Sequence, residues 1–169
     1  MSKLSTAKRT AVIAALVEGN SIRATSRMTD VSEPTVLNLL ADLGRVCAAY
    51  HDEFVTDLQT ERVQCDEIWS FCYAKAKNVP ERTRYPVGAA GDVWTGTAID
   101  ADTKLMISYY VGDRSTHAAD CFMTDLAYRV RRNIQLTTDG HKPYMSAVAF
   151  AFEGRRIDYA MLQKGLPQR

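Results

Sequence analysis

Hydrophobic positions in the first fifty residues recur with the period of an α-helix. A first helix is predicted over 7–18, where Gly19-Asn20 ends it. Ser21 is expected to cap a second, short helix, and Ser32 a third that continues to about Tyr50. The apolar positions that repeat at this spacing are Ala11, Val12, Ala15, Leu16, Val36, Leu39, Leu40 and Leu43.

A short helix and the helix that follows it, joined by a tight turn at 29–31, have the layout of a helix-turn-helix, whose second helix enters the DNA major groove. Asp30 stands at the turn position where glycine is commonest. Aspartate is tolerated there, because it can adopt the left-handed conformation. Base edges and phosphates are the expected targets of Thr35, Asn38, Arg23, Arg27 and Arg45. A three-helix packing or oligomerisation module is the alternative, since residues 1–45 carry only six basic and four acidic side chains.

From residue 63 the pattern changes to the alternation of β-strands, interrupted by two helical stretches. The predicted strands are 63–74, 93–101, 104–112, 134–138 and 157–162, and the predicted helices are 115–132 and 141–152. An antiparallel meander that crosses by a helix to a parallel strand predicts an α/β fold with a mixed sheet of the ribonuclease-H kind. The expected organisation is an all-α helix-turn-helix module at 1–50, a polar linker at 51–62 and an α/β domain at 63–169.

Acidic residues interrupt this pattern at two places. Asp66 and Glu67 stand in the middle of the first strand, whose faces are both largely apolar, so the strand is predicted to be covered on both sides. A buried carboxylate is costly unless it is paired or coordinates a metal. Asp139 ends the fourth strand, which neighbours the first in such a sheet, so Asp66 and Asp139 are expected to meet.

Two carboxylates close together repel each other unless a divalent cation neutralises them, and hard oxygen ligands favour Mg²⁺ or Mn²⁺. Such ions can support phosphoryl transfer on nucleic acid. The alternatives are that Asp139-Gly140 is simply a turn and that Asp66 pairs with an arginine.

Basic residues gather in the stretch 75–91, which is predicted to be a loop. Lys75, Lys77, Arg82 and Arg84 outnumber the single Glu81, so the loop is expected either to face phosphates or to be merely solvated. Lys142, which follows the second acid together with His141, is expected to contact a phosphate or to serve as an ordinary helix start.

Composition limits these interpretations in three ways. The 169 residues are 46% hydrophobic and 24% charged, which excludes a disordered chain and a membrane-spanning one. The net charge of +1 predicts no nucleic-acid binding by itself. Four cysteines without a Cys-x-x-Cys pair, with only three histidines, argue against structural zinc and predict buried thiols in a cytosolic protein.

Three long motifs together resemble insertion-sequence transposases of the IS-one type. They are VQCDEIWSF at 63–71, GDVWT at 91–95 with AIDA at 98–101, and QLTTDGHK at 135–142; shorter matches are VGDR at 111–114 and DYAML at 158–162. The resemblance implies a helix-turn-helix for the element's ends and a ribonuclease-H-like catalytic domain with a DDE metal triad. Asp66 would be its first acid and Asp139 its second, with Mg²⁺ or Mn²⁺ as cofactor.

The same resemblance implies double-stranded DNA as partner, both the terminal repeats and the target. A homo-oligomer is expected, and no membrane, in the bacterial cytoplasm near the nucleoid. The family's third acid is a glutamate on a helix after the last strand, but residues 163–169 no longer look like the family. The chain is therefore expected to be truncated and nearly inactive; the alternatives are a DNA-binding regulator that blocks the full-length enzyme and a decayed remnant that folds poorly.

Overall fold

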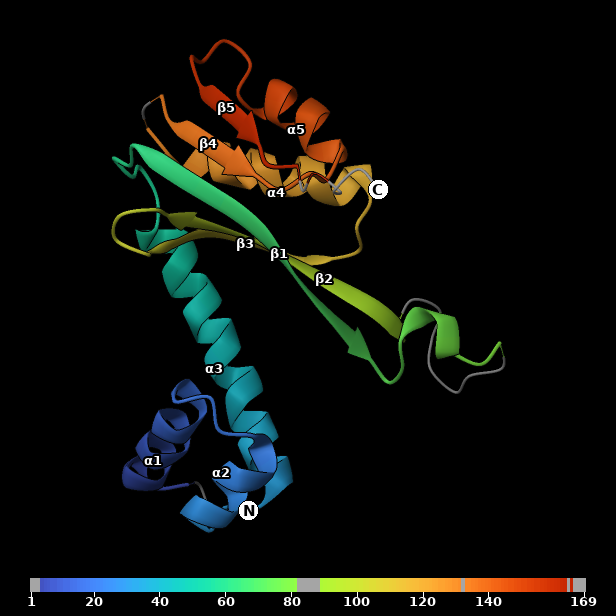
Figure 1. Ribbon diagram of the computed structural model, residues 1–169. Helices are drawn as coiled ribbons and strands as arrows, with labels where there is room; N and C mark the ends of the chain where they lie inside the picture. The colour runs from blue at the N-terminus through green and yellow to red at the C-terminus, as the bar shows by residue number, and fades with distance from the viewer. Residues whose placement is uncertain (1–3, 82–88, 132, 164, 166–169) are drawn as a thin grey trace. The chain divides into compact units, whose positions relative to one another are not determined.

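The computed structural model describes residues 4–81, 89–131, 133–163 and 165. Over these residues the chain is a mixed α/β protein with five α-helices and a five-stranded mixed sheet (Figure 1). It divides into two compact units, Met1–Phe54 and Val55–Arg169, and each of them has its own core.

The first unit consists of the three helices α1 (Thr6–Val17), α2 (Ile22–Thr29) and α3 (Glu33–Phe54). Ser21 caps α2 as predicted, because its Oγ accepts a hydrogen bond from the Ala24 N–H at 3.2 Å. Asp30 ends α2 in the left-handed conformation with φ of 51°, which also confirms the prediction. A small core closes the unit, formed by Val12, Val31 and Val36 with Leu4, Leu16, Ile22 and Leu39 packed against it.

Helix α3 is longer than predicted and includes residues 51–54, which were expected to belong to a linker. The prediction used the mixed charge of this stretch, but charged side chains are equally compatible with an exposed helix. Since neither glycine nor proline interrupts the chain between Gly44 and the end of α3, nothing local breaks the helix there.

The second unit is built on a sheet of strand order β3-β2-β1-β4-β5. Strand β1 pairs antiparallel with β2 and β2 with β3, whereas β1 pairs parallel with β4 and β4 with β5. The strands are β1 (Arg62–Cys72), β2 (Gly91–Asp100), β3 (Met106–Gly112), β4 (Gln135–Thr138) and β5 (Asp158–Met161). The predicted order of strands and helices in this unit is thus confirmed.

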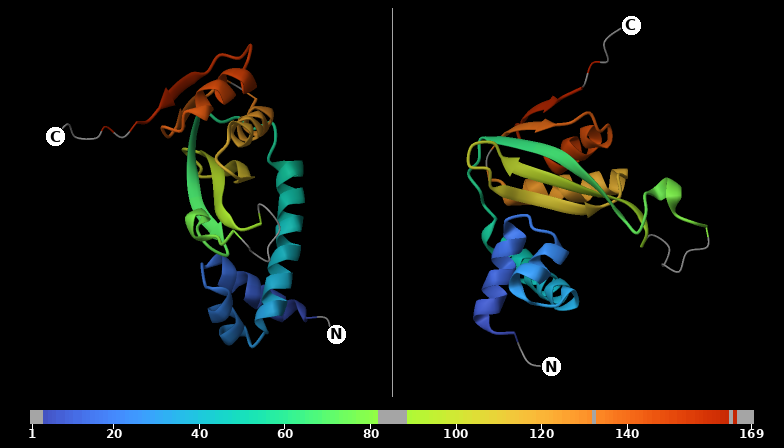
Figure 2. Two further views of the ribbon diagram at one scale, coloured as in Figure 1. Left: turned by 90° about the vertical axis from the view of Figure 1, so that its right-hand side faces the viewer. Right: turned by 60° about the horizontal axis from the view of Figure 1, so that its bottom comes forward.

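Helices α4 (Thr116–Arg129) and α5 (Pro143–Ala151) pack against the same face of the sheet and against each other (Figure 2). Their apolar side chains meet those of the strands in one core, formed chiefly by Val63, Cys65, Ala98, Ile107, Phe122, Met123, Leu126, Leu136, Tyr144 and Val148. Gly96 of β2 permits a close approach to α4, because a Cβ there would lie 3.2 Å from the Phe122 ring. This face therefore carries the main hydrophobic stabilisation of the second unit.

The prediction that the first strand is covered on both sides is wrong. Val63 and Cys65 are buried under the helices, but Asp66, Ile68 and Phe71 are exposed. The second half of β1 and the start of β2 continue as a hairpin away from α4 and α5 (Figure 1). Its apolar residues therefore reflect this extension and not a second covering layer.

The short 3₁₀ helix η1 (Ala76–Asn78) lies in the connection between β1 and β2 and contains Lys77. The predicted loop residues Arg82 and Arg84 lie outside the described residues, as do most of the residues 163–169. Two cysteines contradict the expectation of buried thiols, since Cys47 and Cys72 are exposed, while Cys65 is buried and Cys121 is half-buried. None of the helices in the described ranges has the length and apolar character needed to cross a bilayer.

Candidate functional site

Parallel pairing of β1 with β4 brings Asp66 and Asp139 to corresponding positions of neighbouring strands. The register aligns Gln64 with Thr137. Asp66 lies two residues beyond Gln64, and Asp139 lies two residues beyond Thr137, just after β4 ends. Two residues that are 73 apart in the sequence are thereby placed at the same level of the sheet.

Both aspartates line one cavity of about 650 Å³. Strands β1, β2 and β4 supply most of its wall, which consists of Gln64, Cys65, Asp66, Thr97, Ile99, Thr137, Thr138, Asp139, Gly140 and Leu162. The two carboxylates are the acidic groups in this lining. Their oxygens are the donors that Mg²⁺ or Mn²⁺ prefers, and Mg²⁺ is commonly held by one or two carboxylates with water completing its shell.

Backbone amides orient both carboxylates. Asp66 Oδ1 accepts a hydrogen bond from the Glu67 N–H at 2.8 Å, and Asp139 Oδ1 accepts one from the His141 N–H at 3.2 Å. Asp139 therefore does form a local turn with His141, as one of the alternatives expected. An arginine contact of the kind considered for Asp66 is made, among the described residues, by Asp139, whose Oδ2 lies 3.4 Å from Arg114 Nη2.

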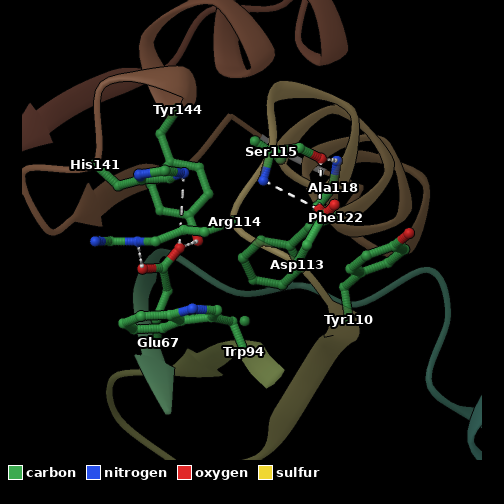
Figure 3. A pocket seen from close by; sticks show the side chains of 12 residues that line it. Glu67, Trp94, Tyr110, Asp113, Arg114, Ser115, Ala118, Phe122, His141 and Tyr144 are labelled. Carbon is green, nitrogen blue, oxygen red and sulfur yellow. Dashed lines mark hydrogen bonds and ion pairs between the residues drawn. The ribbon is translucent and has the colours of Figure 1, made fainter. Parts of the chain in front are cut away.

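Glu67 points to the opposite face of β1 from Asp66, towards α5, and its side chain is only 7% exposed. Arg114, Tyr144 and His141 converge on its carboxylate (Figure 3). Arg114 Nε donates to Oε2 at 2.6 Å, the Tyr144 hydroxyl donates to Oε1 at 3.0 Å, and His141 Nε2 lies 3.9 Å from Oε1. The buried carboxylate of the pair is thus Glu67, and it is satisfied by protein partners.

Burial and charge set the protonation of the groups around Glu67. Burial, together with the adjacent Glu67 carboxylate, raises the pKa of Tyr144, so its hydroxyl keeps the proton that it donates. Burial also raises the pKa of the Cys65 thiol, which remains neutral at the cavity wall. The pKa of His141 is lowered, mainly by burial and further by the nearby Arg114 charge, and Glu67 and Asp139 oppose this shift only in part.

The residues predicted to contact DNA from the first unit lie on α2 and α3. Arg23 and Arg27 are exposed on α2, and Asn38 is exposed near the start of α3. Thr35 is half-buried, and its hydroxyl shares a 2.8 Å hydrogen bond with Ser32. Arg45 is exposed about two turns beyond Asn38 along α3 and forms an ion pair with Asp42.

The lysines predicted to meet phosphates are distributed over the second unit. Lys75 is exposed after β1, with its Nζ 4.9 Å from the centroid of the Trp69 ring, and Lys77 is exposed in η1. Lys142 is exposed at the start of α5, three residues after Asp139. Of these three lysines, Lys142 is thus the one next to a predicted site residue in the sequence.

Sequence reasoning did not find the partners of Glu67. Strand alternation already separates Glu67 from Asp66, and that signal was available. Arg114 appeared only within the short match at 111–114, and Tyr144 only as part of a helix start. Within the described ranges, no cluster of three or more histidine, cysteine or acidic side chains has the geometry to hold a metal ion. Neither the models of known protein families nor the curated proteins include a match to this chain.

Proposed function

We propose that the chain is a DDE-type transposase, which binds the ends of an insertion sequence and catalyses DNA cleavage and strand transfer. The observation that carries the proposal is the joint position of Asp66 and Asp139 at one cavity, on neighbouring parallel strands. The strand order, with two antiparallel pairs followed by two parallel ones, supports a ribonuclease-H-like arrangement of this unit.

DNA binding by the first unit is the second part of the proposal. The turn between α2 and α3 depends on the left-handed Asp30, which is consistent with a helix-turn-helix. Arg23, Arg27 and Asn38 are exposed on the two helices that such a motif would present to DNA. These side chains would contact the terminal repeats, and a second copy of the chain would occupy the other end of the element.

In this proposal Asp66 and Asp139 hold Mg²⁺ or Mn²⁺. When bound there, the ion would lower the pKa of the attacking water or 3′ hydroxyl and stabilise the leaving oxygen. The amides of Glu67 and His141 each bind one oxygen of these carboxylates, and the second oxygen of Asp139 lies 3.4 Å from Arg114 Nη2, so a cation held there would share that oxygen with Arg114. Positioning of the two acids therefore comes from the backbone next to each of them.

Manganese binding tests the metal site directly. Asp66→Asn and Asp139→Asn should each weaken Mn²⁺ binding by about tenfold or more, since each removes a charged ligand. Free and bound Mn²⁺ would be measured by electron paramagnetic resonance on the full chain. Asp158→Asn, which removes the same charge from the start of β5, is the matched control and should bind like the parent protein. Equal affinity in all four proteins would refute the site.

A DNA-binding regulator without catalysis is the second candidate function. It is favoured by the cavity lining, in which the described residues contribute two carboxylates where a DDE site uses three. Supercoiled plasmid DNA with Mg²⁺ or Mn²⁺ separates the two functions. A transposase should nick the plasmid and lose this activity in Asp66→Asn, whereas a regulator should bind DNA equally in the parent, Asp66→Ala and Asp139→Ala and cut it in none of them.

A further inference from the structure

Arg114 connects the buried carboxylate of Glu67 with the carboxylate of Asp139. Its Nε–H donates to Glu67, and its Nη2 lies 3.4 Å from Asp139 Oδ2. The guanidinium also stacks on Trp94, with its Cζ 4.7 Å from the ring centroid (Figure 3). Three neighbours from three different segments of the second unit therefore define where this cation lies.

The exposure of Arg114 separates it from an arginine with a purely structural role. Arg129 in α4 is such a residue: it pairs with Asp125 and donates to the Val55 carbonyl, and its side chain is 8% exposed. Arg114 retains 40% exposure although it is paired. Five N–H groups are available on a guanidinium, and the contacts with Glu67 and Asp139 use only two of them.

We propose that Arg114 contacts a phosphate oxygen of the DNA strand next to Asp139, and that Glu67 is its positioning residue. This inference rests on the proposed function, because it requires DNA at the Asp66–Asp139 cavity. A planar guanidinium suits the task, since it can bind a phosphate through two parallel hydrogen bonds while its Nε–H stays on Glu67. Tyr144 holds the other oxygen of Glu67, so that carboxylate has a fixed orientation from which to aim the arginine.

The first test compares DNA affinity in two arginine variants of the full chain. Binding of a fluorescein-labelled duplex of about 30 base pairs, in Ca²⁺ to prevent cleavage, would be followed by anisotropy at several salt concentrations. Arg114→Gln should bind about tenfold more weakly, and its salt dependence should fall by about 0.9 in slope, as for one lost phosphate contact. Arg131→Gln is the matched control. This exposed arginine is also paired, with Asp57, but it lies just before β4, at the end of the strand opposite to Asp139.

The second test uses Glu67→Gln, for which positioning and simple charge predict opposite signs. Removal of a negative charge near DNA should tighten binding if only the net charge matters. Positioning predicts that Glu67→Gln weakens binding several-fold, although Arg114 and its charge remain. Arg114→Lys should also stay several-fold weaker than the parent, because an ammonium group lacks the planar fork that can bind a phosphate bidentately while one N–H stays on Glu67.

Thermal melts of each variant show whether it folds. If Glu67→Gln does not fold, the comparison of Arg114→Lys with the parent protein still tests the inference. Parent-like affinity and salt dependence in Arg114→Gln would overturn the inference, and tighter binding by a folded Glu67→Gln would overturn the role of Glu67. The Mn²⁺ measurement separates these failures from failure of the proposed function. If Asp66→Asn loses Mn²⁺ binding while Arg114→Gln binds DNA normally, the site stands and only the arginine's role is refuted.

Discussion

Asp100 shows how one side chain can fix a turn between two strands. Its Oδ1 accepts hydrogen bonds from the Asp102 N–H at 2.8 Å and the Thr103 N–H at 2.9 Å, which closes the connection from β2 to β3. The bond from Thr103, supported by Thr60 and Asp102, lowers the pKa of Asp100 below its ordinary value. Lys104 completes the turn with φ of 64°.

The lowered pKa of Asp100 predicts a specific dependence of stability on pH. A carboxyl whose pKa is lower in the folded than in the unfolded chain stabilises the fold when the pH is above its pKa in the unfolded chain. This contribution disappears as the pH falls through the pKa of the folded chain. Asp100→Asn keeps an acceptor oxygen but cannot titrate. Urea unfolding between about pH 5 and pH 2 should therefore show a shallower loss of stability for Asp100→Asn than for the parent protein. Equal slopes would contradict the prediction.

Element packing in the second unit depends on the approach of β2 to α4 at Gly96. Gly96→Ala would place a Cβ 3.2 Å from the ring of Phe122, which is 2% exposed and cannot move freely. The expected cost is about 1–3 kcal/mol in the free energy of unfolding, measured by urea titration with tryptophan fluorescence. The losses from Gly96→Ala and Phe122→Leu should be less than additive in the double variant, because the smaller side chain relieves the contact. Additive losses would show that the ring is not the obstacle.

The order and type of the elements could be predicted from the sequence, because helix and strand periods differ and capping residues mark the starts. Ser21 and Asp30 are examples in which a local rule alone was sufficient. Burial could not be predicted in the same way. Alternation indicates that Asp66 and Glu67 lie on opposite faces of β1, but only the packing of α4 and α5 decides that Glu67 is the buried one.

The candidate site was predictable to the same limited extent. The meeting of Asp66 and Asp139 at one cavity follows from strand order, which the sequence pattern indicated. The ion pair of Arg114 with Glu67 joins residues 47 apart through the end of β3, and no local pattern records such a contact. Long-range polar partners of this kind depend on the three-dimensional arrangement of elements and not on any period along the chain.

At the scale of the whole molecule, two separate cores predict two separate unfolding transitions. Val36 is fully buried in the core of the first unit, while both tryptophans, Trp69 and Trp94, belong to the second. Val36→Ala should lower the free energy of unfolding of the first unit by about 1–3 kcal/mol. The midpoint of that unit's transition, followed by far-ultraviolet circular dichroism, should fall accordingly. The midpoint seen by tryptophan fluorescence should stay unchanged. If both midpoints fall together, the units unfold as one.

The adjacency of Asp66 and Glu67 limits how the length of β1 can vary during evolution. Because side chains alternate along a strand, one residue inserted or deleted within β1 before Asp66 would exchange the surfaces that the two acids face. The aspartate would then enter the apolar layer under α4 and α5, and the glutamate would be left in solvent without Arg114 and Tyr144. A change of two residues would keep each acid on its own face but would move it about 7 Å along the strand, away from Asp139 or Arg114, so related chains should keep the length of this stretch.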